Sequence, residues 1–278
     1  MRSPGLSGRV LPGPFAVFDS FWRHRHLVLS LARRDILARY RGSTLGLFWA
    51  LLSPMLQLAT FTFVFGTIFE SRWDTVLRSK SEFALLLFAG LIAFFFFSDC
   101  INRAPSLVLE NEAYVKRVVF PLEVLPWVAV LSALFQASLN ALVLLIAYLL
   151  VLGIPPWTAL LVPMLVVPLT LVIMGFSWLL ASLGVYLRDV RQLVPVLTTL
   201  VMFLCPIFYP LSAVPEPFRR LIVLNPLSWV VDQIRGALFF GRVPDPIGLA
   251  VATAAGWGVA WLGLAWFART RRGFADVV

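Results

Sequence analysis

Residues 124–187 read VLPWVAVLSALFQASLNALVLLIAYLLVLGIPPWTALLVPMLVVPLTLVIMGFSWLLASLGVYL, a stretch of 64 positions without Asp, Glu, Lys or Arg. A bilayer core about 30 Å thick needs roughly 20 apolar residues per helix, and a helix satisfies its own backbone hydrogen bonds in hydrocarbon. The stretch is therefore long enough to cross a membrane twice. Pro155 and Pro156 lack amide donors and disfavour helix before them, so the segment Gly153–Trp157 predicts a break between two crossings.

Charged residues are also missing from four further windows: 42–69, 83–98, 192–215 and 246–268. The composition agrees with a lipid environment, since 60% of the residues are hydrophobic and 13% are charged. We therefore predict an all-α integral membrane protein with six transmembrane helices. They are expected near residues 47–69, 83–101, 126–151, 158–184, 193–212 and 247–268.

The distribution of Lys and Arg predicts the orientation, because basic loops resist translocation. With a cytoplasmic amino terminus, the inner segments hold 16 of the 23 basic residues and the outer segments hold 7. We predict a multi-pass protein of the plasma membrane with both termini in the cytoplasm. The net charge of +9 follows from this topology, and no nucleic-acid partner is expected.

The predicted crossings hold no ionisable residue except Asp99, at the end of the second. Proton-coupled carriers and intramembrane enzymes need titratable groups inside the membrane, so both classes are disfavoured, although Ser, Thr and carbonyl groups could still bind Na⁺. The chain also has no phosphate-binding loop of the form GxxxxGK[ST]. If ATP drives this protein, another polypeptide must bind it. We expect no catalytic residue, metal site or cofactor in this chain.

The amino-terminal part divides into a flexible tail, expected over residues 1–20, and a segment over residues 21–46 rich in Arg and Leu. The second segment predicts an amphipathic helix and loop at the cytoplasmic interface. It is either an anchor that sets topology or a site where Arg forks bind pyrophosphate. The candidate residues are Arg33, Arg34, Arg39, Tyr40, Arg41, Gly42, Leu45 and Gly46.

Residues 102–125 mix charges with helix-forming residues, and prolines at 121 and 126 end the segment. This pattern predicts a short helix that lies across the cytoplasmic face. It is either a solvated loop helix or a lever on which a soluble partner pushes. The candidate residues are Glu110, Asn111, Glu112, Tyr114, Lys116 and Arg117.

Residues 213–246 form the least loop-like of the outer segments. Asn225 and Pro226 are typical of a helix start, and Gly241 can end the helix. The helix is too short and too polar to cross, which predicts a re-entrant or interfacial element, either a gate at the outer mouth or a passive anchor. Its apolar stripe consists of Leu227, Val230, Val231, Ile234 and Leu238. The candidate gate residues are Asn225, Pro226, Trp229, Asp232 and Arg235, with the last two expected off the stripe.

Aromatic residues crowd the first and fifth predicted crossings. Most are expected to face lipid or to pack in the core, but aromatic rings can also stack on the apolar faces of sugars. The candidates for a sugar path are Phe61, Phe65, Phe69, Phe208 and Tyr209.

Several motifs together resemble the membrane subunits of bacterial polysaccharide ABC exporters. They are RRDILARYRGSTLGLFW at 33–49, Ser53-Pro54, FVF at 63–65, NEAYVKR at 111–117, Phe120-Pro121 and Asn225-Pro226. The likeness runs over most of the chain from about residue 20, and O-antigen export permeases look closest.

The resemblance implies a homodimeric permease with six crossings per subunit, paired with two copies of a separate ATPase that binds ATP and Mg²⁺. It implies that residues 33–46 lie near the entrance for a glycan linked to undecaprenyl diphosphate, that 110–117 couple to the ATPase, and that 221–241 form the outer gate. The expected function is export of O-antigen across the bacterial inner membrane for lipopolysaccharide biosynthesis. Export of teichoic acid or capsule, export of drugs or lipids, and a membrane enzyme acting on polyprenyl phosphate are the alternatives.

Overall fold

The structure is a computed structural model that describes residues 13, 15–41, 45–64, 80–115, 120–211 and 214–277. Within these ranges the regular elements are all helical and no strand occurs, as the apolar windows predict. The α-helices are α1 (Ala16–Tyr40), α2 (Trp49–Phe63), α3 (Lys80–Arg103), α4 (Glu112–Val115), α5 (Leu125–Val151), α6 (Val162–Tyr186), α7 (Val190–Leu204), α8 (Glu216–Leu224), α9 (Pro226–Phe239), α10 (Pro246–Thr270) and α11 (Phe274–Val277).

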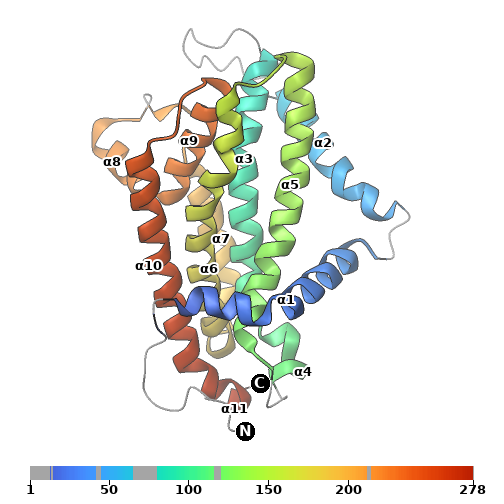
Figure 1. The fold of residues 1–278 in the computed structure, drawn as a ribbon, viewed down its shortest axis with the longest axis vertical. Helices are drawn as coiled ribbons and strands as arrows, with labels where there is room; N and C mark the ends of the chain where they lie inside the picture. The colour runs from blue at the N-terminus through green and yellow to red at the C-terminus, as the bar shows by residue number, and fades with distance from the viewer. Residues whose placement is uncertain are drawn as a thin grey trace.

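Four helical stretches are long and apolar enough to cross a membrane. Figure 1 shows the corresponding helices α3, α5, α6 and α10 as an upright bundle, with α2 leaning away from it at one edge. Helices α2 and α7 are apolar but have 15 residues each, and at about 1.5 Å per residue they fall short of a 30 Å core. Residues 65–69 of the first predicted crossing lie outside the described residues. The described part of the chain thus contains four helices of crossing length, and the count of six stays a prediction.

The predicted helical hairpin within residues 124–187 is confirmed. Helix α5 ends at Val151, and Gly153 follows with φ +84°, a left-handed conformation that favours glycine. A 3₁₀ turn over Trp157–Leu161 then leads into α6. The prolines at 155 and 156 therefore separate two crossings, as their missing amide donors predict.

Glycines allow α6 to pack closely against its neighbours. A Cβ atom at Gly263 of α10 would collide with the backbone carbonyl oxygen of Gly175 in α6, and one at Gly184 would collide with that of Pro105. Without a hydrophobic driving force between helices in lipid, such close backbone approach provides much of the attraction. The large side chains of Trp178 in α6 and Phe267 in α10 are fully buried.

The fifth predicted crossing is shorter than expected. Helix α7 begins at Val190 and ends at Leu204, whereas we predict a crossing over 193–212. Pro206 and Pro210 cannot donate to a helical ladder, and the carbonyls of Pro206 and Ile207 instead accept hydrogen bonds from the guanidinium of Arg235 at 2.7 and 2.8 Å.

Helix α1 crosses the lower part of the bundle transversely (Figure 1), as an interface helix would. It begins at Ala16, so the prediction of a flexible tail up to residue 20 is wrong for its last residues. The reason is packing: Val17 is 1% exposed, and Ser20 is buried where its hydroxyl accepts a hydrogen bond from Trp127 Nε1 at 3.0 Å.

The carboxyl-terminal segment, predicted as a cytoplasmic tail over 269–278, packs against the bundle in its described part. Phe274 is fully buried between the rings of Tyr186 and Phe267. Arg271 forms an ion pair of 2.9 Å with Glu123, which precedes α5. The segment thus fastens the end of α10 to α6 and to the start of α5.

The glycine contact predicts a difference between two substitutions in α10. Gly263→Ala should lower the free energy of unfolding by about 1–3 kcal/mol, because the methyl group meets the Gly175 carbonyl. Gly258→Ala should be neutral or stabilising by up to about 1 kcal/mol, because nothing lies within 4 Å of its Cβ position. Thermal unfolding in one detergent measures both, and equal unfolding temperatures would contradict the close packing of α6 and α10.

Candidate functional site

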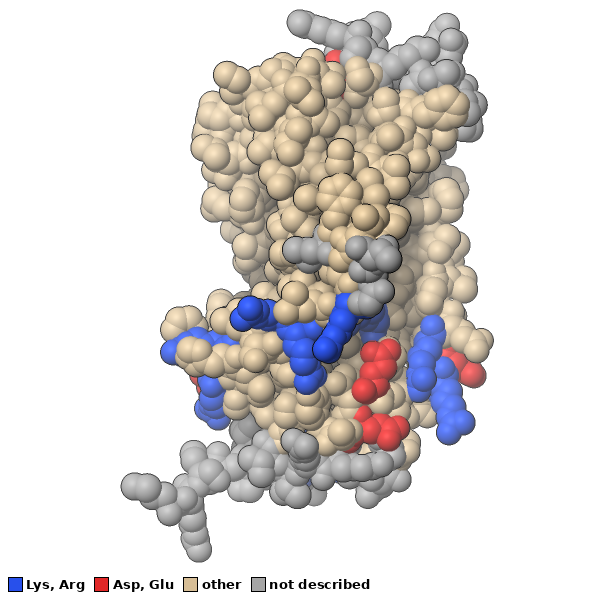
Figure 2. Space-filling view, turned by 90° about the vertical axis from the view of Figure 1, so that its right-hand side faces the viewer, with Lys and Arg blue, Asp and Glu red and all other residues tan. Residues whose placement is uncertain are grey.

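Charged side chains gather at one end of the molecule. Figure 2 shows them as a band across the lower part of one face, with a surface of uncharged residues above it. Figure 1 places α1 and α4 at this lower end. The band lies where the long apolar helices end, which is where a membrane–water interface attracts Arg.

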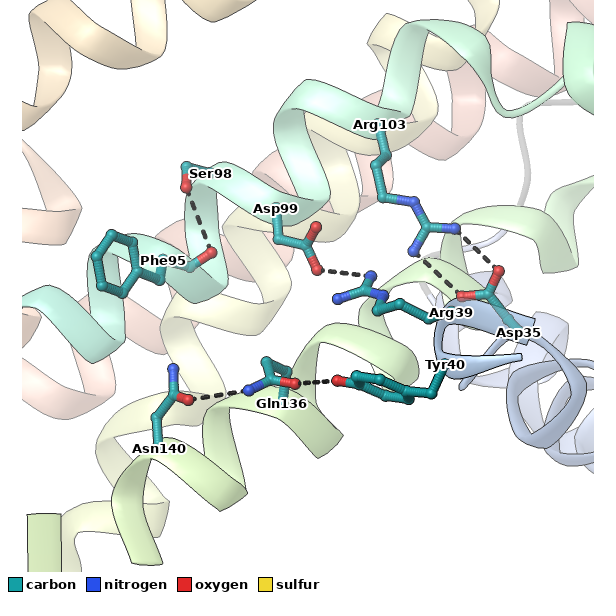
Figure 3. Close-up of polar contacts among 9 residues, drawn as sticks. All are labelled: Asp35, Arg39, Tyr40, Phe95, Ser98, Asp99, Arg103, Gln136 and Asn140. Carbon is teal, nitrogen blue, oxygen red and sulfur yellow. Dashed lines mark hydrogen bonds and ion pairs between the residues drawn. The ribbon is translucent and has the colours of Figure 1, made fainter. Parts of the chain in front are cut away.

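Two ion pairs connect α1 to the end of α3. Arg39 Nη2 lies 3.0 Å from Asp99 Oδ2. Arg103 binds Asp35 with both arms of its guanidinium, at 3.1 and 3.0 Å (Figure 3). All four side chains are about one third exposed or less, and bidentate pairs are stronger than single contacts.

The environment of Asp35 keeps its carboxylate ionised. Burial alone would raise the pKa of Asp35, but the hydrogen bonds and charge of Arg103, with the charge of Arg39, outweigh this effect and lower the pKa below its ordinary value. The pair between Asp35 and Arg103 therefore persists at neutral and mildly acidic pH.

A chain of neutral hydrogen bonds runs beside the ion pairs. Tyr40 donates its hydroxyl to Gln136 Oε1 at 2.6 Å, and Gln136 Nε2 donates to Asn140 Oδ1 at 3.0 Å (Figure 3). Burial raises the pKa of Tyr40, so its hydroxyl remains a donor. Gln136 Nε2 also donates to the Ala50 carbonyl of α2 at 3.2 Å. The chain thus joins α1, α2 and α5.

These groups surround a cavity of about 300 Å³ between α1, α2, α3 and α5, named here the inner cavity. Its walls combine an ion pair, amides and a hydroxyl with aromatic rings, so they offer donors, acceptors and apolar faces. The lining residues are Arg39, Tyr40, Trp49, Ser53, Pro54, Gln57, Phe95, Phe96, Asp99, Ala133, Gln136, Ala137 and Asn140.

Among the predicted pyrophosphate residues, Arg39 and Tyr40 line the inner cavity. Arg33, Arg41 and Leu45 are exposed, Gly46 has φ +50° at the turn into α2, and Gly42 lies outside the described residues. Arg34 points toward α4 instead, where it donates to the Tyr114 hydroxyl at 2.8 Å. The structure therefore brings together two of the eight candidates around this cavity.

The described part of the coupling segment contains short helical elements. Its α-helix, α4, covers four residues, with 3₁₀ turns before it, and Lys116 and Arg117 lie outside the described residues. Tyr114 stacks on Phe120 with ring centroids 4.3 Å apart, while Glu110 accepts a hydrogen bond from Ser106 and Asn111 donates to the Leu107 carbonyl. Pro105 breaks the run from α3, and local side-chain contacts stabilise the turns that follow. Glu112 is exposed.

The predicted helix start in the outer segment is confirmed. Asn225 Oδ1 accepts from the Leu227 amide at 3.0 Å, Pro226 is the first residue of α9, and Gly241 has φ +62° just after its end. Trp229 is half-buried and Asp232 is exposed.

The prediction that Arg235 lies off the buried face is wrong, because it is 5% exposed. Its guanidinium donates to the carbonyls of Leu86, Pro206 and Ile207, which compensates for its burial. Arg235 thus fixes α9 to α3 and to the chain after α7.

The predicted aromatic residues are only partly described. Phe61 and Phe208 are half-buried against the core, and the Tyr209 hydroxyl donates to the Phe203 carbonyl at 2.9 Å. Phe65 and Phe69 lie outside the described residues. Whether these rings line a path stays a prediction.

The sequence reasoning missed Asp35, Arg103, Gln136 and Asn140 as site residues. Gln136 and Asn140 are spaced four apart inside a charge-free stretch, which places two amides on one helix face within lipid. Polar groups at such positions need partners, and this signal could have identified them.

Comparison with known proteins identifies a family. The family described as ABC-2 type transporter matches residues 26–239. The O-antigen export system permease protein RfbA of Myxococcus xanthus is 28% identical over 264 residues, which cover 92% of this chain and 97% of that protein. A protein of the same name from Klebsiella pneumoniae is 24% identical and covers 91% and 95%. The polysialic acid transport protein KpsM of Escherichia coli is 25% identical and covers 80% and 84%.

The pair between Asp35 and Arg103 predicts a loss of stability in Asp35→Asn. The free energy of unfolding should fall by about 1–2 kcal/mol at pH 7, because a half-buried bidentate pair loses its charge. Asp19→Asn is the matched control on α1, and its pair with Arg23 is largely exposed, so about 0.5 kcal/mol or less is expected.

The pH dependence of this difference has a definite sign. Asp35 has a lowered pKa in the folded protein, so its contribution is present above the unfolded value of about 3.9 and is lost as the pH falls through the folded value. Unfolding temperatures of wild type and Asp35→Asn should therefore differ at pH 7 and 5 and converge below about pH 4. A difference that disappears already at pH 6 would contradict this assignment.

Proposed function

Because the chain belongs to the ABC-2 type transporter family, we propose that it is the permease subunit of an ATP-driven exporter for a polysaccharide linked to undecaprenyl diphosphate. O-antigen is the glycan that we favour, since proteins named as O-antigen export permeases match this chain over more than nine tenths of its length. The match to a polysialic acid transport protein makes an anionic capsular glycan the second candidate.

The inner cavity is the observation that carries the proposal. A lipid-linked glycan presents a diphosphate at the membrane interface, with sugar hydroxyls on one side and a hydrocarbon chain on the other. The cavity offers a guanidinium, amides, a hydroxyl and aromatic rings at the level of the interface helix. Arg forks bind phosphate oxygens, while amides and aromatic faces suit sugars.

The expected assembly follows from the same family membership. We propose a homodimer with six crossings per subunit and both termini in the cytoplasm of a bacterial inner membrane. Two copies of an ABC ATPase bind ATP and Mg²⁺ and contact α4 and its neighbours. In this orientation the charged band of Figure 2 faces the cytoplasm, in agreement with the excess of Lys and Arg there. Teichoic acid, drugs and other lipids remain alternative cargoes.

Deletion of the gene should cause the lipid-linked glycan to accumulate inside the cell. When the Arg39→Gln variant is expressed in the deletion strain, it should restore export poorly. Without the guanidinium the diphosphate loses a charge-assisted contact, so export should fall about tenfold or more. Arg41→Gln should weaken export further if the exposed Arg41 also binds phosphate. The measurement is the amount of glycan at the cell surface and on the inner carrier lipid, by gel and by mass spectrometry.

Two controls separate phosphate binding from loss of the ion pair. Arg39→Gln leaves Asp99 without its partner, whereas the double variant Arg39→Gln/Asp99→Asn removes both charges. If Arg39 binds phosphate, the double variant stays defective, and recovered export would show that the unpaired Asp99 was the cause. Arg25→Gln, on the same helix and exposed, should export normally. If no glycan accumulates in the deletion strain, the proposed function is contradicted. If the deletion strain loses one surface polymer, that polymer is the cargo.

The coupling segment predicts the effect of charge reversal. The double variant Glu110→Lys/Glu112→Lys should release the ATPase or abolish the stimulation of its ATP hydrolysis by substrate. The reason is that the reversed charges at and beside α4 would repel the ATPase surface that the two exposed carboxylates attract. Glu216→Lys, on α8 at the other end, is the control. Copurification of the ATPase and its hydrolysis rate report both effects. If coupling stays intact, the ATPase contact lies elsewhere, and the next candidate is the charged segment RDVR at residues 188–191, after α6 and into the start of α7.

A further inference from the structure

A second cavity, of about 530 Å³, lies between the end of α7, α8 and α9, and is named here the outer cavity. Figure 1 shows α8 and α9 in the half of the molecule away from α4 and α11. Its volume falls in the range of about 300–1,000 Å³ typical of small-molecule sites. The lining residues are Pro206, Pro210, Leu211, Val223, Ser228, Trp229, Val231, Asp232, Arg235, Gly236, Phe240 and Arg242.

The outer cavity combines the groups that recognise sugars. Asp232 provides a carboxylate that accepts from hydroxyl groups, and Arg242 provides a planar fork that donates to them. The rings of Trp229 and Phe240 provide flat apolar surfaces that match the C–H faces of a pyranose. Carboxylate, guanidinium and aromatic groups thus converge on one space.

Fixed contacts hold these groups in place. The Arg242 guanidinium lies over the Phe240 ring at 5.4 Å, and the Arg242 amide donates to the Gly236 carbonyl at 2.9 Å. Gly248 of α10 leaves room for the Trp229 indole, which lies 3.2 Å from its ideal Cβ position. Arg235 fastens the wall to α3. A preorganised wall lowers the entropy cost of binding a flexible polymer.

The mixture of charges favours a saccharide over a phosphate or lipid headgroup. Arg235 also lines the cavity, but its guanidinium already donates to three backbone carbonyls, so an anion would meet Arg242 and Asp232 together, whereas sugar hydroxyls both donate and accept. We propose that the outer cavity is a second glycan-binding site, which holds a saccharide unit of the exported polymer as it leaves the membrane. This inference rests on the proposed function, because it takes the exported polymer as its ligand.

The test uses the permease purified with its ATPase in detergent, without ATP. The probe is a mixture of short oligosaccharides obtained by mild acid hydrolysis of the host's total surface polysaccharide. Saturation-transfer NMR titrations measure their binding. Asp232→Asn and Arg242→Gln should each weaken binding about tenfold, whereas Glu216→Gln and Arg220→Gln on α8, outside the cavity lining, should bind as wild type does.

A variant of the inner cavity separates the two sites. Gln136→Leu removes an amide of the inner cavity, so any oligosaccharide binding that this variant abolishes belongs to the inner cavity and not to the outer one. If Gln136→Leu abolishes binding while Asp232→Asn and Arg242→Gln do not, or if the wild type binds no oligosaccharide, the inference is overturned. Export of glycan by the deletion strain complemented with Asp232→Asn or Arg242→Gln is an independent readout, so normal export by these variants sinks this inference alone. If oligosaccharides bind the outer cavity but no glycan accumulates in the deletion strain, the proposed function is contradicted instead.

Discussion

Hydrocarbon cannot hydrogen-bond to a peptide group, and this constraint shapes the parts of the chain that are not helical. After α7 the backbone turns at Pro206 and Ile207, and the guanidinium of Arg235 supplies the donors that their carbonyls lack. Near the turn between α5 and α6, the Thr158 hydroxyl donates to the Ala237 carbonyl of α9 at 2.6 Å. Side chains from distant segments thus stabilise each irregular stretch. These hydrogen bonds also fasten α9, which lines the outer cavity, to α3 and to the chain after α7.

At the opposite end, charges are arranged in pairs between separate elements. Arg39 pairs with Asp99, Arg103 with Asp35, and Arg271 with Glu123, so α1 and the carboxyl-terminal segment are both fastened to the bundle. The pairing reduces the local charge at the inner cavity even though the chain carries +9. A guanidinium has five N–H donors, so Arg39 can keep Asp99 and still donate to an incoming phosphate oxygen. The carboxylate of Asp99 thus fixes the position of the Arg39 guanidinium.

The elements that depend on local signals could be predicted from the sequence. The break at Gly153–Trp157 follows from two prolines and a glycine, and the start of α9 follows from Asn225 and Pro226, because each signal acts within a few residues. The end of α7 and the burial of Arg235 could not be predicted, since the carbonyl of Leu86 lies 149 positions from Arg235 in the chain. The inner cavity could be predicted only in part. Arg39 and Tyr40 are evident from their position in the chain. Asp99, the partner of Arg39, lies 60 positions away, and Arg103, the partner of Asp35, lies 68 positions away, so both pairs depend on how α1 crosses α3.

The two cavities share a property that bears on the energy source for transport. Both combine donors, acceptors and aromatic rings, and each lies toward one end of the bundle, while residues 124–187 contribute no charge to the membrane between them. In the proposed export, a polar polymer would contact polar groups at the two cavities, and α5 and α6 would offer it no charged group on the way. Binding alone cannot keep moving the polymer in one direction, because binding at equilibrium shifts populations but supplies no net work. Movement in one direction requires that the affinity of one cavity for the polymer change while the polymer occupies the other cavity. The contact of Arg34 with Tyr114 joins α4 to the helix that carries Arg39 and Tyr40, so a displacement of α4 acts first on the inner cavity.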